Sequence, residues 1–168
     1  MGIFKSPRGA CGRLREGLLM QLFIGSDYRG FEMKQQLLSF LAEQGYNTTD
    51  LGAYGYNEGD DFNDPAIAVA SAVRENLGSI GILVCDSAHG VTMQANRFRG
   101  IRAANCDSQE SAVLAREHDD ANILCLSAHF VDIDRAESII TTFLKTQFDS
   151  LERRVRRINR LDEGVNYD

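Results

Sequence analysis

The sequence predicts an α/β fold: a three-layer α/β/α sandwich built on a five-stranded parallel, Rossmann-like sheet. Five short apolar runs alternate along the chain with segments of helical periodicity, which is typical of a parallel sheet covered by helices on both faces. The chain has 168 residues, of which 43% are hydrophobic and 25% charged, as expected for one soluble domain with a continuous core. No internal repeat interrupts the alternation.

Each element follows from its local pattern. Strands are expected at residues 21–25, 46–51, 80–85, 101–105 and 122–126, and helices at 31–44, 65–76, 91–98, 109–117, 133–146 and about 151–161. In the first helix, Phe31, Lys34, Leu37 and Leu41 form a mostly apolar stripe at helical spacing. Pro65 suits the first turn of the second helix, where a backbone N–H is not needed.

The two ends of the chain differ from the rest. We interpret residues 1–19, which are basic and rich in glycine, as an extension, a weak targeting segment or the product of an upstream start, with the single folded domain spanning 20–168. The last helix places five arginines between residues 152 and 160. It is either a solvated basic face or an arm that carries arginines to an anionic ligand, in this subunit or a neighbouring one. Arg153 and Arg157 share one helical face, as two ligands of one phosphate require.

Composition excludes several classes of function. The net charge of −6 argues against a general nucleic-acid-binding surface. No apolar run approaches the roughly 18 residues of a membrane span. The cysteines show no metal-binding spacing, so free thiols in a reducing cytoplasm are expected. We therefore expect a cytoplasmic protein that binds neither nucleic acid nor membrane.

The candidate site centres on Cys85, which ends a buried strand and opens a tight loop leading into a helix. Ligands of doubly wound sheets bind beyond the carboxyl ends of the strands. A helix N-terminus and loop amides favour negative charge, so we expect this thiol to ionise readily. We expect the loops carrying Asp27 and Tyr28, His118 and Asp119, and Ser127 to His129 to gather around it.

The chain resembles a known family, the type B ribose-5-phosphate isomerases and the related galactose-6-phosphate isomerase subunits. The resemblance runs from about residue 21 to residue 159. The motifs that carry it are Ile-Gly-Ser-Asp at 24–27, Cys85 with Gly90 five residues later, Ala-Asn-Arg-Phe at 95–98 with Gly-Ile-Arg-Ala at 100–103, Ala-Arg-Glu-His-Asp at 115–119, and the terminal Arg-x-x-x-Arg-Ile.

The resemblance implies interconversion of aldose and ketose phosphates through an enediolate, with no metal or organic cofactor. Carried over by position, Cys85 is the base that moves a proton between two carbons, and the loop amides of residues 86–90 hold the developing oxyanion. Ser87 lies near the sugar oxygens, His118 opens the sugar ring, and Asp27 holds sugar hydroxyls.

The family also implies an assembly of several subunits. Arg153 and Arg157 match phosphate-binding arginines that members donate across a subunit interface. A homodimer is therefore expected. A homotetramer and a homologous partner subunit remain open.

Departures from the family pattern cluster in the site. Where members carry Gly-Thr-Gly-x-Gly, this chain has Asp86, Ser87, Ala88, His89 and Gly90. The loss of two glycines restricts the backbone, and Asp86 adds a negative charge beside the expected anion hole.

The remaining departures concern sugar and phosphate contacts. Tyr28 replaces a histidine, Phe62 a tyrosine, Asp119 an asparagine, and His129 an arginine expected to meet the phosphate. The substrate is therefore either ribose 5-phosphate or a related tetrose, pentose or hexose phosphate.

Two other classes of function also use a cysteine or a sugar-phosphate site of this kind. A Cys-x5-Arg phosphatase is disfavoured because Val91 stands where its arginine is required. The stronger alternative is a binding subunit of the same family that no longer catalyses alone. The direction of the Asp86 side chain separates a catalytic isomerase from a binding subunit, because a carboxylate pointing into the anion hole would oppose an anionic intermediate.

Overall fold

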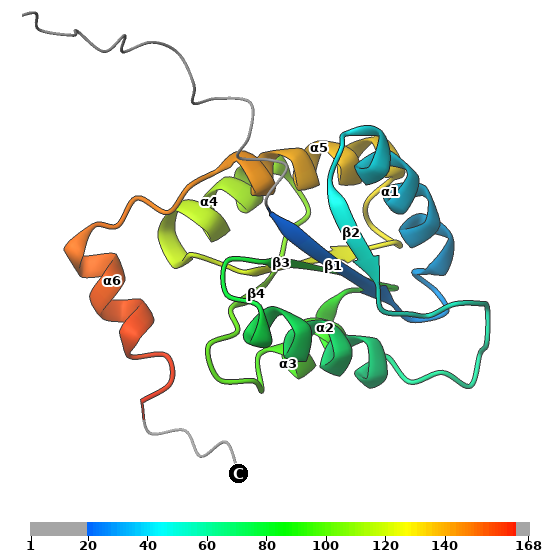
Figure 1. Cartoon of the computed structure of the whole chain (residues 1–168), viewed down its shortest axis with the longest axis horizontal. Helices are drawn as coiled ribbons and strands as arrows, with labels where there is room; N and C mark the ends of the chain where they lie inside the picture. The colour runs from blue at the N-terminus through cyan, green and yellow to red at the C-terminus, as the bar shows by residue number, and fades with distance from the viewer. Residues whose placement is uncertain (1–19, 164–168) are drawn as a thin grey trace, which may run out of the picture.

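The computed structural model describes residues 20–163 and has the predicted three layers (Figure 1). All five strands are parallel and lie in the order β2-β1-β3-β5-β4. The strands are β1 (Gln21–Ser26), β2 (Asn47–Asp50), β3 (Ile80–Cys85), β4 (Ala103–Asn105) and β5 (Ile123–Ser127). The helices are α1 (Phe31–Glu43), α2 (Asn63–Glu75), α3 (His89–Ala95), α4 (Gln109–Asp119), α5 (Ile133–Lys145) and α6 (Glu152–Asn159). The predicted fold class is confirmed.

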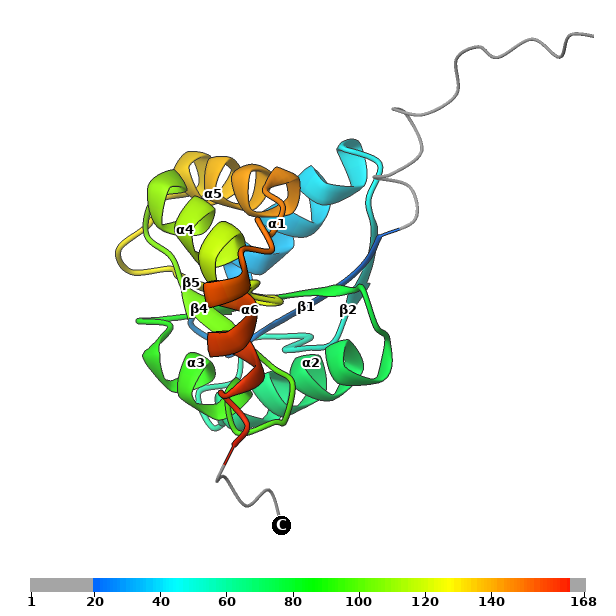
Figure 2. The same ribbon diagram turned by 90° about the vertical axis from the view of Figure 1, so that its left-hand side faces the viewer.

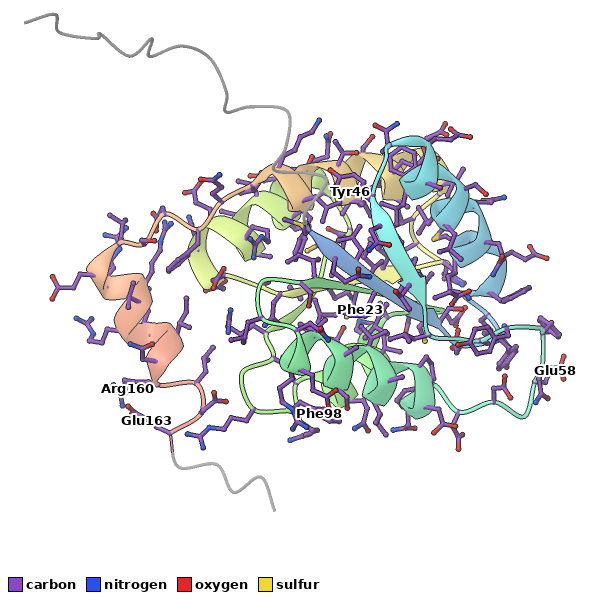
Figure 3. All side chains as sticks on the ribbon, viewed as in Figure 1. Phe23, Tyr46, Glu58, Phe98, Arg160 and Glu163 are labelled. Atoms are coloured by element: carbon purple, nitrogen blue, oxygen red, sulfur yellow. The ribbon has the colours of Figure 1, made fainter. Side chains whose placement is uncertain are left out.

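Helices α1, α4 and α5 cover one face of the sheet, and α2 and α3 cover the other (Figures 1 and 2). Each face has its own apolar core because side chains alternate along a strand. In β1, Leu22 and Ile24 join the core beneath the first group of helices, whereas Phe23 joins the core on the α2–α3 side (Figure 3).

Two helix boundaries differ from prediction in ways that matter for the site. Helix α3 begins at His89 and ends at Ala95, so His89 and Gly90 belong to its first turn rather than to a loop. Its early start follows from Ala88, whose left-handed backbone (φ 63°) turns the chain directly into the helix. Helix α4 continues to Asp119, which places His118 and Asp119 in its last turn.

Lys34 does not fit the simple reading of α1 as an apolar stripe. Its side chain is fully buried, and its ammonium group lies 2.6 Å from both carboxylate oxygens of Asp50 at the end of β2. A buried cation requires such a partner, so this pair ties α1 to the edge strand.

Helix α6 stands outside the three layers. Both views place it beside the amino ends of the strands, separate from the helices that cover the sheet (Figures 1 and 2). None of its residues is buried. The predicted basic helix is confirmed, and the proposed extension at residues 1–19 lies outside the described residues. Within residues 20–163, no helix is long and apolar enough to cross a membrane.

Candidate active site

The chain connections of the sheet diverge at the carboxyl ends of β1 and β3: β1 leads to β2 on one side, and β3 leads to β4, beyond β5, on the other. Such a point is where open α/β sheets bind ligands. The chain leaves β1 close to the backbone of β3: Asp27 N–H donates to the Val84 carbonyl at 3.3 Å. Gly30 is required here, because a Cβ at that position would lie 2.5 Å from the Val84 oxygen. This approach brings Asp27 beside Cys85.

Cys85 and Asp27 are in direct contact. The Cys85 thiol donates a hydrogen bond to Asp27 Oδ2 at 3.0 Å, and the residues are only 6% exposed. The other carboxylate oxygen of Asp27 accepts the Gly30 N–H at 2.8 Å. The Asp27 carboxylate is thus engaged within the chain by a turn and by the thiol.

The environment of Cys85 opposes ionisation, which corrects the expectation of a readily formed thiolate. Burial, followed by the hydrogen bond and negative charge of Asp27, raises the pKa of the Cys85 thiol to about 12. The backbone amides of Ala88 and Asp86 act in the opposite direction but do not outweigh these effects. The resting group is a neutral thiol whose proton faces a carboxylate.

The loop after Cys85 keeps a glycine-like shape despite its missing glycines. Of its non-glycine residues, only Ala88 has a positive φ, and its side chain is fully buried. Gly90 cannot be replaced easily, because a Cβ there would lie 2.8 Å from the Phe62 ring. Ser87, which is half-buried, directly precedes Ala88.

Asp86 is directed towards the neighbouring loop after β5. Its Oδ1 lies 3.7 Å from His129 Nδ1. The two loops are joined by backbone contacts: His129 N–H donates to the Asp86 carbonyl at 3.1 Å, and the Ser127 hydroxyl donates to the same oxygen at 2.6 Å. Among the described residues, the Asp86 carboxylate accepts no hydrogen bond from the amides of its own loop.

A cavity of about 290 Å³ opens beside this pair. It is lined by Tyr28, Arg29, Glu32, Tyr56, Asp86, Ala128 and His129. The rings of Tyr28 and Tyr56 meet edge to face at 5.4 Å, and the Arg29 guanidinium lies over the Tyr28 ring at 5.3 Å. Sequence reasoning predicted Tyr28, Asp86 and His129 but missed Arg29, Glu32 and Tyr56.

The other four predicted residues lie at the opposite edge of the sheet. Helix α4 runs back to the amino ends of the strands, so His118 and Asp119 emerge there, just before β5. The expectation that they join Cys85 within one chain is therefore wrong. Arg153 and Arg157 are exposed on α6 at this same edge.

The last turn of α4, which carries His118, is bonded to α6 through Glu117. Arg154 Nη1 donates to the Glu117 carbonyl at 3.1 Å and pairs with Asp149. His118 Nε2 lies 3.5 Å from Glu117 Oε1. Arg153 and Arg157 have no ion pair with any described residue, which leaves both guanidinium groups available.

Within residues 20–163, no three His, Cys, Asp or Glu side chains are arranged to hold a metal ion. The chemistry of the two edges is therefore that of a thiol, carboxylates, imidazoles and guanidinium groups.

Comparison with known proteins identifies the family of the chain. The model of the Ribose/Galactose Isomerase family matches residues 22–161. The chain belongs to this family. A probable ribose-5-phosphate isomerase B from Mycoplasma genitalium is 39% identical over 148 residues, which cover 88% of this chain and 95% of that protein. The ribose-5-phosphate isomerase B of Escherichia coli is 31% identical over 150 residues, covering 88% of this chain and 100% of that protein.

Solved structures of the Ribose/Galactose Isomerase family have the same fold. A ribose 5-phosphate isomerase from Thermotoga maritima superposes with a TM-score of 0.83 at 39% identity, covering 86% of this chain and 99% of that one. The Mycoplasma genitalium enzyme with bound ribulose-5-phosphate gives a TM-score of 0.82 at 38% identity, covering 86% and 95%. The predicted family, and with it the prediction that the chain is an isomerase, is confirmed.

Proposed function

We propose that this chain interconverts an aldose phosphate and its ketose, with ribose 5-phosphate and ribulose 5-phosphate as the first pair to test. The contact between Cys85 and Asp27 at the diverging point of the sheet is the observation that carries the proposal. It provides a sulfur and a carboxylate, side by side and shielded from water, where a substrate carbon can approach. The similarity to ribose-5-phosphate isomerases B supports the choice of a five-carbon sugar.

The neutral thiol defines how the proton moves. As Cys85 Sγ takes a proton from the substrate carbon, its own proton passes to Asp27, and the reverse transfers return a proton to the neighbouring carbon. Asp27 is thus the proton acceptor of the pair instead of a ligand for sugar hydroxyls. The loop amides of residues 86–90 stabilise the enediolate oxygen, and each such donor can contribute about 2.7–4 kcal/mol.

A second copy of the chain supplies the rest of the site. Arg153 and Arg157 are unpaired among the described residues, and α6 also exposes apolar side chains, with Val155 37% exposed and the flanking Leu151 and Leu161 45% and 56% exposed. A charged and partly apolar helix with no buried residue, held to its own chain through Arg154, is suited to another subunit. We place this helix and His118 over the Cys85 edge of the second copy, where the arginines bind the phosphate and His118 opens the sugar ring.

The departures around the cavity fit a substrate-binding role. Asp86 is held by His129 and turned to the cavity side, so its charge does not occupy the anion-binding amides. Tyr28 and His129 line the cavity next to Asp86, which the distal part of the sugar enters. A binding subunit that does not catalyse alone remains the second candidate, favoured by the strained Ala88 and by the high pKa of Cys85.

Solvent-deuterium exchange followed by NMR tests both candidates. Wild-type protein is incubated in D2O with four-, five- and six-carbon aldose and ketose phosphates and with unphosphorylated sugars. We expect deuterium at C1 or C2 of a pentose phosphate, and a loss of at least about 100-fold in Cys85→Ala, because a positioned base contributes 10²–10⁴-fold. Cys106→Ala is the matched control, since Cys106 is also a buried thiol but lies outside the site.

The pattern of exchange decides the outcome. Exchange of another sugar phosphate, lost in Cys85→Ala, would keep the mechanism and change the substrate. No exchange across the panel would contradict the isomerase proposal for this chain alone and favour the binding subunit.

A further inference from the structure

The largest cavity among those described lies far from Cys85, at the amino edge of the sheet, and has a volume of about 510 Å³. This volume falls within the 300–1,000 Å³ typical of small-molecule sites. Its walls come from the end of α2 and the following turn, the loop before β4, the end of α4 and the start of β5. The isomerase proposal makes no use of this cavity.

Positive charge dominates the lining. Four arginines, Arg74, Arg99, Arg102 and Arg116, line the cavity together with one carboxylate, Asp120. Asp120 is shared: its Oδ2 lies 2.8 Å from Arg102 Nη2 and its Oδ1 lies 3.2 Å from Arg116 Nη1. One carboxylate therefore balances two buried or half-buried guanidinium groups, and the other two arginines add uncompensated charge.

Two of the arginines form a rigid wall. Arg102 donates through all three guanidinium nitrogens, to the carbonyls of Asp120 and Gly100 and to the Asp120 carboxylate. Arg116 uses Nη1 alone, which donates to Asp120 and to the Ala121 carbonyl. Burial lowers the pKa of the Arg116 guanidinium, as expected for a cation that is incompletely compensated.

The other two arginines are available to a ligand. Arg74, near the end of α2, is exposed, and its guanidinium lies over the Phe98 ring at 5.5 Å (Figure 3 labels Phe98). Arg99 is also exposed and directly follows Phe98 in the loop between α3 and β4. Neither Arg74 nor Arg99 has an ion pair with any residue in the range 20–163. In addition, Ser79 Oγ and Arg116 Nε are buried without a hydrogen-bond partner among the described residues, and both belong to residues of this cavity. Unsatisfied polar atoms of this kind are few in folded proteins.

We propose that the cavity binds a small phosphate-bearing anion, at a second site distinct from the Cys85 centre. Arginine forks match phosphate oxygens in geometry, and the excess of guanidinium groups over the single carboxylate suits a di- or trianion better than a monocarboxylate. The cavity is also larger than a diphosphate group, so an organic part can be accommodated. The proposal does not depend on the isomerase activity.

Calorimetric titration of the full chain tests this site, with pyrophosphate and ADP as separate probes. We expect binding by the wild type and at least about tenfold weaker binding by Arg74→Gln/Arg99→Gln, because charge-assisted hydrogen bonds are lost. Arg97→Gln is the control: it removes one positive charge from the loop that carries Arg99, but Arg97 does not line the cavity. Because all three arginines are exposed, thermal unfolding should be unchanged in these variants.

A further variant separates the two sites. Arg153→Gln/Arg157→Gln should leave binding of the probes intact, since these arginines belong to the proposed catalytic assembly. Tighter binding of ADP than of pyrophosphate identifies an organic phosphate as the occupant, whereas equal binding identifies the diphosphate group alone; both support the site. Absence of binding at millimolar probe, binding unchanged in Arg74→Gln/Arg99→Gln, or binding lost in Arg153→Gln/Arg157→Gln would overturn the proposal.

Discussion

The two edges of the sheet are built in opposite ways. At the carboxyl edge, Cys85 and Asp27 are buried, in contact with each other and fixed by the turn around Gly30. At the amino edge, Arg153 and Arg157 are exposed on a helix that lies outside the three layers. The group proposed to move protons is thus fully organised within one chain, whereas the groups proposed to bind phosphate point away from it.

In the proposed assembly, this difference separates the half of the site that one chain forms from the half that needs a second copy. A buried thiol–carboxylate pair needs no partner to form, because its packing and hydrogen bonds are intramolecular. Two unpaired arginines four residues apart gain a role only when an anion is brought between them. In a two-fold symmetric dimer, the carboxyl edge of each chain faces the amino edge of its partner, so two complete sites can form.

Mixing two defective variants provides the sharpest test of this comparison. Cys85→Ala and Arg153→Ala/Arg157→Ala should each be strongly impaired alone, the former by at least about 100-fold. A purified heterodimer of the two carries one site in which both edges are intact, so it should recover about half of the wild-type activity. Isomerisation is measured on co-expressed, differently tagged chains. A heterodimer as inactive as its parents would show that each site is built within one chain.

Asp27→Asn separates reactivity of the thiol from catalysis. Removing the negative charge lowers the pKa of Cys85, because Asp27 contributes to its elevation. Alkylation of Cys85 at pH 8 should therefore accelerate, about tenfold for each unit by which the pKa falls. Activity should fall by about 100-fold, since the thiol has lost the group that takes its proton. The two rates are followed by mass spectrometry and NMR.

Cys106 is the internal reference for that alkylation, because its thiol is buried elsewhere and should be unaffected. If activity rose together with alkylation, Asp27 would be a restraint on the thiolate and not part of the proton relay.

The phosphate arginines should affect binding more than chemistry. Arg153→Gln and Arg157→Gln each remove charge-assisted hydrogen bonds worth about 1.5–3 kcal/mol, so KM should rise about 10- to 100-fold with a smaller change in kcat. Arg156→Gln is the matched control on the same helix. Steady-state kinetics with ribose 5-phosphate gives both constants. Equal effects of all three substitutions would indicate general electrostatics rather than two defined ligands.

The sequence was sufficient to predict the fold and the residues around Cys85. Alternation of apolar runs and helical stripes specifies a parallel sheet, and residues that follow parallel strands must share its carboxyl edge. Asp27, Asp86 and His129 were found by this rule. His118 and Asp119 were misplaced because they precede a strand, and α4 carries them to the amino edge.

The electrostatics of the site could not be predicted in the same way. A helix N-terminus is visible in the sequence and favours a thiolate, but the burial of Cys85 and its contact with Asp27, 58 residues away, arise only in three dimensions. Tyr56 was missed for a similar reason: it lies in the irregular segment between β2 and α2, where no periodicity indicates which side chains reach the cavity.

The smallest expected effect is on the pH dependence of stability, and it compares Cys85 with Cys125, a thiol of the core. The pKa values of Cys85 and Cys125 are each raised to about 12, in both cases chiefly by burial. Below the ordinary thiol pKa of 9.0, both thiols are protonated in the folded and unfolded chains, so their contribution to stability is complete. Above that pH the unfolded chain loses these protons first. The free energy of unfolding should therefore decline between about pH 9 and 12, by up to about 1.4 kcal/mol per pH unit for each thiol.

Urea unfolding of Cys85→Ala and Cys125→Ala across this pH range measures how much each thiol contributes to the decline in the free energy of unfolding. Each substitution should make the decline shallower by a similar amount, since the two thiols are expected to titrate alike. A slope unchanged in Cys85→Ala but reduced in Cys125→Ala would show that Cys85 ionises near its ordinary pKa in the folded protein. The thiolate would then form without Asp27, and the carboxyl edge would hold a ready base in place of a proton relay.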